Sequence, residues 1–302
     1  MTTCVPSPAS VPMADALSPR PSAPWVLSSP ALLLFVGILL VPLALTAVLS
    51  FNAFDGMRGI QPNYTLANYA EILTDSYYHQ IFVRTGLMAL GVTALCVLLG
   101  VPETLILARM QAPWRGLFLV VILGPLLISV VVRTLGWSIL LGSQGMINNA
   151  LQSLGVIDGP IRFLFSMLGV VIALTHVFVP FMVIAVWSAL QKLDPQVEHA
   201  GRSLGATPST SFLRIVFPQL LPGVLSGSII VFALAASAFA TPSIIGGRRV
   251  KVVATATYDE FLNSMNWPLG AAIAVLLLLA NVVIIVGCNR MLERRFKQVF
   301  AS

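Results

Sequence analysis

The chain has 302 residues, of which 57% are hydrophobic and only 9% are charged. This composition excludes a water-soluble globular protein, because the surface of such a protein carries more charge. The net charge of +6 comes from lysines and arginines that are scattered between apolar runs. Scattered basic residues are typical of the charges that flank membrane helices, whereas a nucleic-acid-binding protein gathers them on one face.

Residues 1–29 are rich in proline, serine and alanine, and we predict a disordered N-terminal tail there. Six apolar runs follow, and each reaches the ~20 residues that a helix needs to cross the hydrocarbon core. The predicted fold is therefore all-α, a polytopic membrane domain of six transmembrane helices over 30–290 with a cytoplasmic tail at 291–302. The six runs are 31–50, 81–108, 117–141, 163–190, 223–245 and 269–288.

The lysines and arginines are divided unevenly between the two sides of these runs. One side carries ten of them and the other carries seven, and the second side also carries most of the acidic residues. The short connection 109–116 on the first side contains arginines and no acidic residue. Because cytoplasmic loops have an excess of Lys and Arg, we predict that both termini are cytoplasmic.

Besides Arg84 near the outer end of the second run, three ionisable residues fall within the predicted spans, where such residues are rare and need a partner. Glu103 is near the inner end of its span, so it either has a function or extends toward the interface. Arg133 is eighteen residues beyond Arg115, or ~27 Å at ~1.5 Å per residue, which predicts a position near the outer interface. There, snorkelling or pairing between loops is favoured over direct contact with a substrate. His176 falls near mid-membrane, where an interhelical hydrogen bond is favoured over lining of the pore.

Two further features concern the fifth run and the outer side. Gly223 and Gly227 form a G-x-x-x-G pair followed by many small residues, which suits close helix packing or a translocation surface. Packing is the safer interpretation. Asp259 and Glu260 on the outer side would suit contact with a cationic substrate or a binding protein, although solvated acidic loop residues are common.

The connection between the fourth and fifth runs is long for an inner loop, and it contains the signals for two short helices. Asp194 can cap a helix that begins at the following proline, and Gly205 stands where a left-handed residue ends a helix. Thr207 then caps a second helix that opens at Pro208 and runs toward Pro218.

The first of these helices has two different faces. A stripe of mostly small residues follows helical spacing, and polar residues occupy the opposite face. Such a helix either docks on another protein or lies on the membrane surface. The stripe is Val197, Ala200, Gly201 and Leu204, and the polar residues are Glu198, His199, Arg202 and Ser203.

Aligned on Gly205, the loop reads H-A-G at 199–201 and I-V-F-P at 215–218. This spacing resembles the EAA loop of binding-protein-dependent ABC importer permeases, whose pattern is E-A-A, three residues, glycine, nine residues and I-x-L-P. The resemblance implies that residues 191–222 form coupling helices that seat in a groove of an ATPase subunit. It assigns this role to Glu198, His199, Ala200, Gly201, Gly205, Ile215 and Pro218.

Two positions depart from the family pattern. His199 stands where the family has glutamate, and Phe217 stands where it has leucine. Glu198, one residue earlier, could partly substitute for the usual glutamate contact.

Other segments look like the spermidine/putrescine-type permeases, and the resemblance covers roughly residues 30–290. It implies a type I ABC importer-like permease fold and a pore-forming subunit that moves a polyamine such as spermidine or putrescine. Another small solute, such as an opine, an amino-acid derivative or a phosphonate, is the alternative. The segments are R-T-L-G-W at 133–137, L-L-G-S-Q-G-M-I-N at 140–148, V-P-F-M-V at 179–183 and N-W-P-L-G-A-A at 266–272.

The resemblance also implies partners in the bacterial inner membrane: a second homologous permease subunit, two ATPase subunits and an extracytoplasmic solute-binding protein. A P-loop needs a lysine followed by serine or threonine, and the three lysines here precede Leu, Val and Gln. We therefore expect ATP and Mg on the partner ATPase and no cofactor or metal on this chain. A secondary transporter or a membrane enzyme would leave the long inner loop unexplained, and we find no catalytic constellation.

Overall fold

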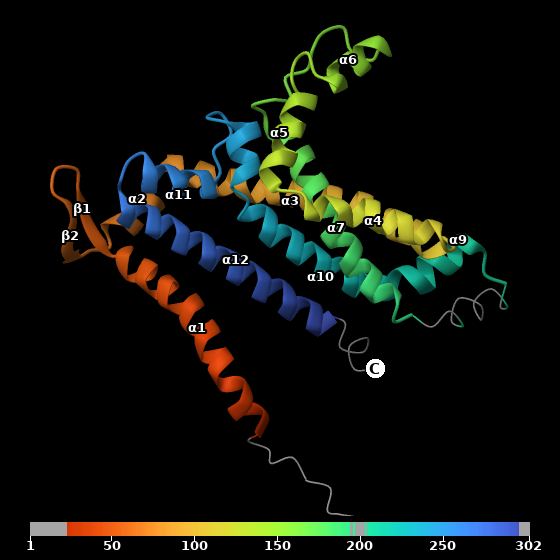
Figure 1. The fold of residues 1–302 in the computed structure, drawn as a ribbon, viewed down its shortest axis with the longest axis horizontal. Helices are drawn as coiled ribbons and strands as arrows, with labels where there is room; N and C mark the ends of the chain where they lie inside the picture. Colours follow the sequence, from red (N-terminus) through yellow and green to blue (C-terminus); the bar gives the residue numbers. More distant parts are fainter. Residues whose placement is uncertain (1–22, 194–195, 197–202, 204, 296–302) are drawn as a thin grey trace, which may run out of the picture. The chain divides into compact units, whose positions relative to one another are not determined.

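The computed structural model describes residues 23–193, 196, 203 and 205–295 (Figure 1). The chain divides after Thr46 into two compact units, which are described separately. The described part of the first unit is helix α1 (Ala23–Leu49) up to Thr46. It begins inside the predicted tail, because Pro24 occupies the first helical turn, where a missing N–H is tolerated. The rest of the predicted N-terminal tail lies outside the described residues.

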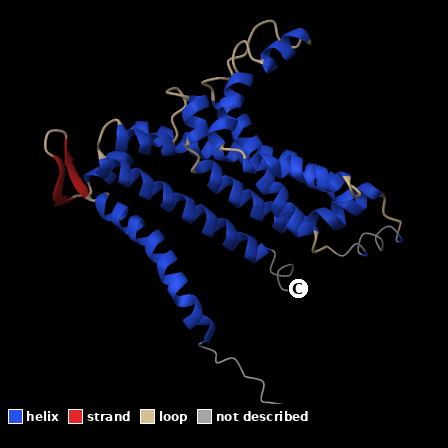
Figure 2. Ribbon diagram, in the orientation of Figure 1, coloured by secondary structure: helices blue, strands red, loops and turns tan. Residues whose placement is uncertain are grey.

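The second unit opens with a small antiparallel hairpin, β1 (Asn52–Asp55) and β2 (Gly59–Tyr64), shown in red in Figure 2. The short helix α2 (Ala67–Thr74) follows. Buried Asn68 fastens it, because its Nδ2 donates to the carbonyl oxygens of Ser50 and Asn52, each over 2.9 Å. The sequence analysis did not predict this hairpin.

Three long helices form the centre of the second unit, namely α3 (Ser76–Arg109), α7 (Met167–Leu190) and α10 (Phe217–Ala236). They lie side by side in Figure 1. Their apolar faces bury one another, while the outward apolar residues stay exposed, as expected for helices in a bilayer. The buried core includes Met88, Val92 and Cys96 of α3, Val170, Leu174 and Met182 of α7, and Val231 and Ala235 of α10.

Glycines bring these helices into close contact. A Cβ on Gly223 would collide with the Cβ of Ala189, and a Cβ on Gly227 would stand 2.8 Å from the Sδ of Met182. On α3, a Cβ on Gly100 would stand 2.9 Å from the Cγ of the same methionine. The packing interpretation of the G-x-x-x-G pair is confirmed, since small residues allow two backbones to approach.

The third apolar run is not one straight helix. It forms α4 (Trp114–Leu127) and α5 (Val130–Leu140), whose axes differ by 101°. The single span predicted over 117–141 is therefore wrong in this respect. Ile128 and Ser129 have extended backbones just beyond Pro125, which interrupts the helical hydrogen bonds. A hydropathy profile does not reveal this break, because the residues on both sides of it are apolar.

The fifth run also has different limits from those predicted. A helical path begins at α9 (Pro208–Ser211), continues through the π-helical segment η1 (Phe212–Val216) and runs through α10 to Ala236. The residues predicted to complete the span instead form a separate π-helical segment, η2 (Pro242–Gly246). The start is earlier because Pro218 lies in the first turn of α10, where proline is tolerated.

Three helices remain. Helix α6 (Met146–Ser153) lies in the loop after α5, which was predicted to be on the outer side, α11 (Val253–Leu262) follows η2, and α12 (Trp267–Arg295) extends into the predicted C-terminal tail. Among the described residues, five helices are long and apolar enough to cross a membrane, or six with the bent pair. The predicted all-α membrane fold is confirmed, with the third span broken.

Candidate functional site

The described part of the inner loop has the predicted turn chemistry. Gly205 has φ +87°, a left-handed conformation that residues with a side chain rarely adopt. The Oγ1 of Thr207 accepts a hydrogen bond from the N–H of Thr210 over 3.3 Å, which caps α9 at its start. The predicted start of the second loop helix is confirmed at Thr207, and Gly205 has the predicted left-handed conformation.

Glu198, His199, Ala200 and Gly201 lie outside the described residues, as does the predicted cap Asp194. Gln196 and Ser203, from the same predicted helix, are helical.

The end of the loop joins the membrane helix directly. Ile215 lies in η1 and Pro218 in the first turn of α10, so the predicted second helix does not stop near Pro218. The side-chain amide of Gln219 donates to the carbonyl of Ile215 over 3.0 Å across this junction. The rings of Phe212 and Phe217 also pack together, with centroids 6.2 Å apart. The end of the loop and the following span therefore form one continuous helical path, from α9 through η1 into α10.

His176 makes the interhelical hydrogen bond that was the favoured interpretation. The indole Nε1 of Trp137 on α5 donates to the Nδ1 of His176 on α7 over 3.2 Å. Their ring centroids are 5.5 Å apart in an edge-to-face arrangement. This contact joins α5, the outer half of the broken span, to the central bundle.

Arg133 lies close enough to His176 for their charges to interact. His176 is nine residues beyond the outer end of α7 at Met167, or ~14 Å along a helix. The position of Arg133 near the outer interface stays a prediction, although the straight helix assumed for the distance from Arg115 is broken between α4 and α5. Its Nε and Nη1 atoms are buried and have no hydrogen-bond partner.

Glu103 and His176 line one cavity of about 760 Å³ between α3, α4, α5 and α7. The walls are mostly leucine, isoleucine, valine and proline, so these two side chains, with Thr175 and Trp137, supply its polar groups. Glu103 and His176 therefore face the same space, whereas Arg133 is not among the lining residues.

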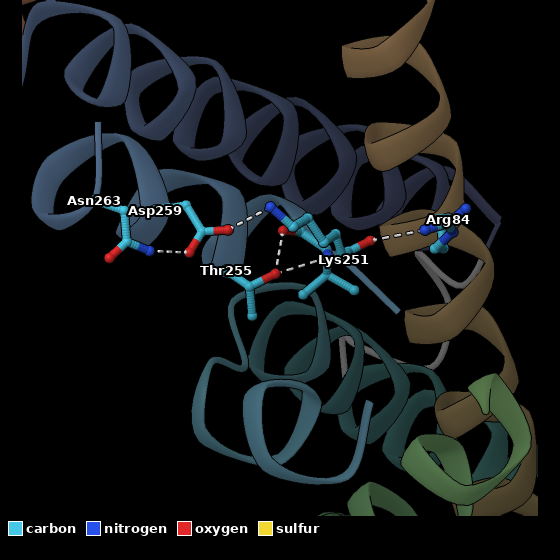
Figure 3. A network of polar contacts seen from close by, with 6 residues as sticks. Arg84, Lys251, Thr255, Asp259 and Asn263 are labelled. Carbon is cyan, nitrogen blue, oxygen red and sulfur yellow. Dashed lines mark hydrogen bonds and ion pairs between the residues drawn. The ribbon is translucent and has the colours of Figure 1, made fainter. Parts of the chain in front are cut away.

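At the outer end, Asp259 belongs to a network within the chain (Figure 3). Its Oδ2 lies 2.6 Å from the Nζ of Lys251, and its Oδ1 accepts from Asn263 over 2.8 Å. Arg84 on α3 donates to the carbonyl of Lys251 over 3.5 Å. The hydrogen bond to Asp259 raises the pKa of Lys251. Because both partners are about one-third exposed, the pair contributes only about 0–1 kcal/mol.

Threonines fix α11 to α3 in the same network. The N–H of Val252 donates to the Oγ1 of Thr255 over 2.9 Å, and the N–H of Val253 donates to the Oγ1 of Thr85 over 2.9 Å. Burial raises the pKa of neighbouring Glu260, and the nearby carboxylates add to that effect. Asp259 and Glu260 are thus built into the packing of α11.

Asn148 is a structural residue that the sequence analysis did not single out. It is fully buried, and its Nδ2 donates to the carbonyls of Gly142 and Ile161 over 2.9 and 3.0 Å. Its Oδ1 accepts from the N–H of Ile161 over 2.9 Å. The asparagine therefore closes the outer loop. A polar residue at the end of the glycine-containing segment 140–148 was the available signal.

We predict that Asn148→Ala loosens this outer loop. It removes three hydrogen bonds and leaves the N–H of Ile161 without its partner, at about 1–3 kcal/mol for an unsatisfied group. Limited proteolysis of purified protein should therefore cut the loop faster. The matched control is Asn149→Ala, because exposed Asn149 makes one hydrogen bond, to Gln144. Equal cutting of both variants would contradict the role of Asn148.

The family model described as "Binding-protein-dependent transport system inner membrane component" matches residues 22–298. The spermidine/putrescine transport system permease protein PotB of Escherichia coli is 34% identical over 228 residues, covering 76% of this chain and 82% of the relative. The molybdenum transport system permease protein ModB of Mycobacterium bovis is 35% identical over 194 residues, covering 64% of this chain and 71% of the relative.

The fold has a solved counterpart as well. A chain of a bacterial ABC transporter that imports the acidic polysaccharide alginate superposes with a TM-score of 0.70. The match covers 91% of this chain and 97% of that chain at 19% identity, so it bears on the fold alone. With the family model spanning nearly the whole chain, this protein belongs to the binding-protein-dependent transport system inner membrane components, the permease subunits of ABC importers.

Proposed function

We propose that this permease carries a polyamine of the spermidine or putrescine class into the cytoplasm. The observation that supports this most is the 34% identity to the spermidine/putrescine permease of Escherichia coli over 76% of this chain. The acidic side chains at the outer end agree with a cationic solute, because Glu71, Asp259 and Glu260 lie close enough for their charges to interact.

An inorganic anion is the second candidate. The molybdenum permease of Mycobacterium bovis is 35% identical to this chain, although over a shorter stretch. Permeases of this family therefore keep similar sequences while serving different solutes. The cognate binding protein decides between the two, and its purified form should bind spermidine or putrescine and not molybdate.

The proposed assembly contains this chain, a second homologous permease, two ATPase subunits that bind ATP and Mg, and an extracytoplasmic solute-binding protein. The inner loop 191–222 would be the coupling element. The unbroken helical path from α9 through η1 into α10 supports this role. A displacement of the loop would move α10 with it. Because α10 packs against α3 and α7, this movement would also shift the central helices.

The transport mechanism predicts that this chain does not act alone. Purified chain in liposomes should neither hydrolyse ATP nor accumulate polyamine along an ion gradient. Adding the ATPase, the second permease and the loaded binding protein should restore ATP-dependent uptake. Ion-driven uptake by the isolated chain would instead identify a secondary transporter.

The charge bias predicts that both termini are cytoplasmic. Single cysteines at Gly155 and Ser264 should react with a membrane-impermeant maleimide in intact cells. Cysteines at Gln111, Ser209 and Ser302 should react only after permeabilisation. One exchanged position would overturn this topology.

A further inference from the structure

Glu103 is an acidic side chain inside the membrane that has no partner. Of the eleven acidic residues in the chain, it is the only one that falls within the six apolar runs. Within residues 23–193, 196, 203 and 205–295, its carboxylate makes no hydrogen bond and no ion pair. An unpaired carboxylate is unfavourable there, so acidic residues within spans pair with a cation or face a cavity.

The position of Glu103 along α3 sets its depth. It lies one turn beyond Gly100, which packs against Met182 of the central bundle. It also lies six residues, or ~9 Å, before the end of α3 at Arg109. Arginines flank spans at the membrane surface, and the ammonium group of a lipid headgroup stays at that surface. A lipid headgroup therefore does not supply the partner of Glu103.

The cavity that Glu103 lines has the size of a site for a small organic ligand. Its volume of about 760 Å³ falls within the ~300–1,000 Å³ of such sites. Among its lining residues, Glu103 is the one acidic side chain, and neither lysine nor arginine is present. Leu98, Ile106 and Val121 of the wall are 58–68% exposed. The cavity is therefore open on one side, and a ligand can enter it.

The other polar groups of the cavity lie at a different level. The Sγ of Cys96 donates to the carbonyl of Thr175 over 3.7 Å, so His176 lies near the level of Cys96, seven residues or ~10 Å along α3 from Glu103. The Nδ1 of His176 accepts from Trp137, so the neutral imidazole carries its proton on Nε2, which can only donate. An ammonium group has donors and no acceptor. It can therefore bind at Glu103 and not at His176.

Four kinds of occupant can be compared. A lipid acyl chain would fill the apolar walls and leave the carboxylate unpaired. An anion such as molybdate would be repelled by the carboxylate. A divalent metal ion needs several ligands, and the described residues contain no group of three or more His, Cys, Asp or Glu that could hold one. An alkylammonium fits both parts, since its charge pairs with Glu103 and its methylene chain contacts the apolar walls.

We infer that this cavity binds one ammonium group of the transported solute, with Glu103 as its counterion and the apolar walls in contact with the adjoining methylene chain. This rests on the proposed function in one respect, since a polyamine supplies the ammonium. Glu103 would thus give the permease a preference for cations of its own, in addition to the choice that the binding protein makes. An anionic solute would meet an unpaired negative charge in the same place.

The first test measures spermidine uptake and ATP hydrolysis by the assembled transporter. Glu103→Gln keeps the size of the side chain and removes its charge. We expect uptake to fall at least about tenfold, because the ammonium loses a hydrogen bond to a charged group. ATP hydrolysis stimulated by the loaded binding protein should persist, which shows that the variant is folded and assembled. Glu103→Asp keeps the charge and should retain more uptake than Glu103→Gln.

The matched control is Asp158→Asn, which removes the same charge from an exposed loop residue and should leave uptake unchanged. Equal uptake by Glu103→Gln and Asp158→Asn would overturn the site. Polyamine uptake that is absent from the wild-type transporter would instead contradict the proposed function.

The second test measures equilibrium binding of radiolabelled spermidine to the purified chain in an uncharged detergent. Glu103→Gln should weaken saturable binding at least about tenfold, and Asp158→Asn should not. Phosphatidylethanolamine added to the micelles should not compete, and competition by it would overturn the assignment to a transported solute. Binding that is absent from the wild-type chain, or equal in the wild type and Glu103→Gln, would show that Glu103 is not the counterion.

Discussion

Replacing Gly205 with valine is expected to abolish ATPase association and solute uptake while the membrane helices stay inserted. Gly205 has φ +87°, and a β-branched residue there costs roughly 1–3 kcal/mol or forces the backbone into another conformation. Either outcome turns the loop helix on one side of Gly205 away from α9 on the other. Co-purification of the ATPase and uptake at matched expression measure the effect.

The control for this substitution is Gly287→Val on α12. Gly287 does not have a positive φ, and a Cβ there would meet nothing within 4 Å. It should retain ATPase binding and uptake. If Gly205→Val also retains both, the inner loop is not the coupling element.

The sequence predicts the effects of three further substitutions in the loop, which can be measured in the same way. Ala200→Trp enlarges the small-residue stripe and should also separate the ATPase. His199→Glu restores the residue that the family has at this position and should be tolerated. Glu198→Lys reverses the remaining acidic charge and should weaken docking.

Gly223→Leu is expected to prevent the central bundle from packing. A Cβ at this position would collide with the Cβ of Ala189, and it would stand 3.2 Å from the carbonyl oxygen of Ala185. Because part of the obstacle is backbone, α7 and α10 would have to separate, at a cost of about 1–3 kcal/mol or more. Thermal unfolding of the purified protein in detergent should show a markedly lower midpoint.

Two variants define the scale of that effect. Gly227→Ala should be milder, because its new Cβ meets mainly the flexible side chain of Met182. Gly287→Leu should have little effect, since the space beside it is open. Equal midpoints for Gly223→Leu and Gly287→Leu would show that α7 and α10 are not held together at this contact.

Much of this protein could be read from local sequence. The length of each apolar run predicted the membrane helices, because the bilayer itself demands about 20 apolar residues per span. Gly205 and Thr207 predicted a helix end and a helix start, because these residue types satisfy backbone requirements that are local. The spacing of the loop and the motifs around it predicted the family. The matches to known proteins confirm that prediction.

The tertiary structure decided which residues meet. The chain bends by 101° after Leu127, and Trp137 on the far side of that bend donates to His176 of α7. Asp259 looked free in the sequence and is bound by Lys251. Hydropathy and periodicity predict whether each segment is surrounded by lipid, protein or water. Contacts between residues of different segments depend instead on the path of the backbone that connects those segments. A two-residue break such as that at Ile128 and Ser129 redirects the path without changing the composition.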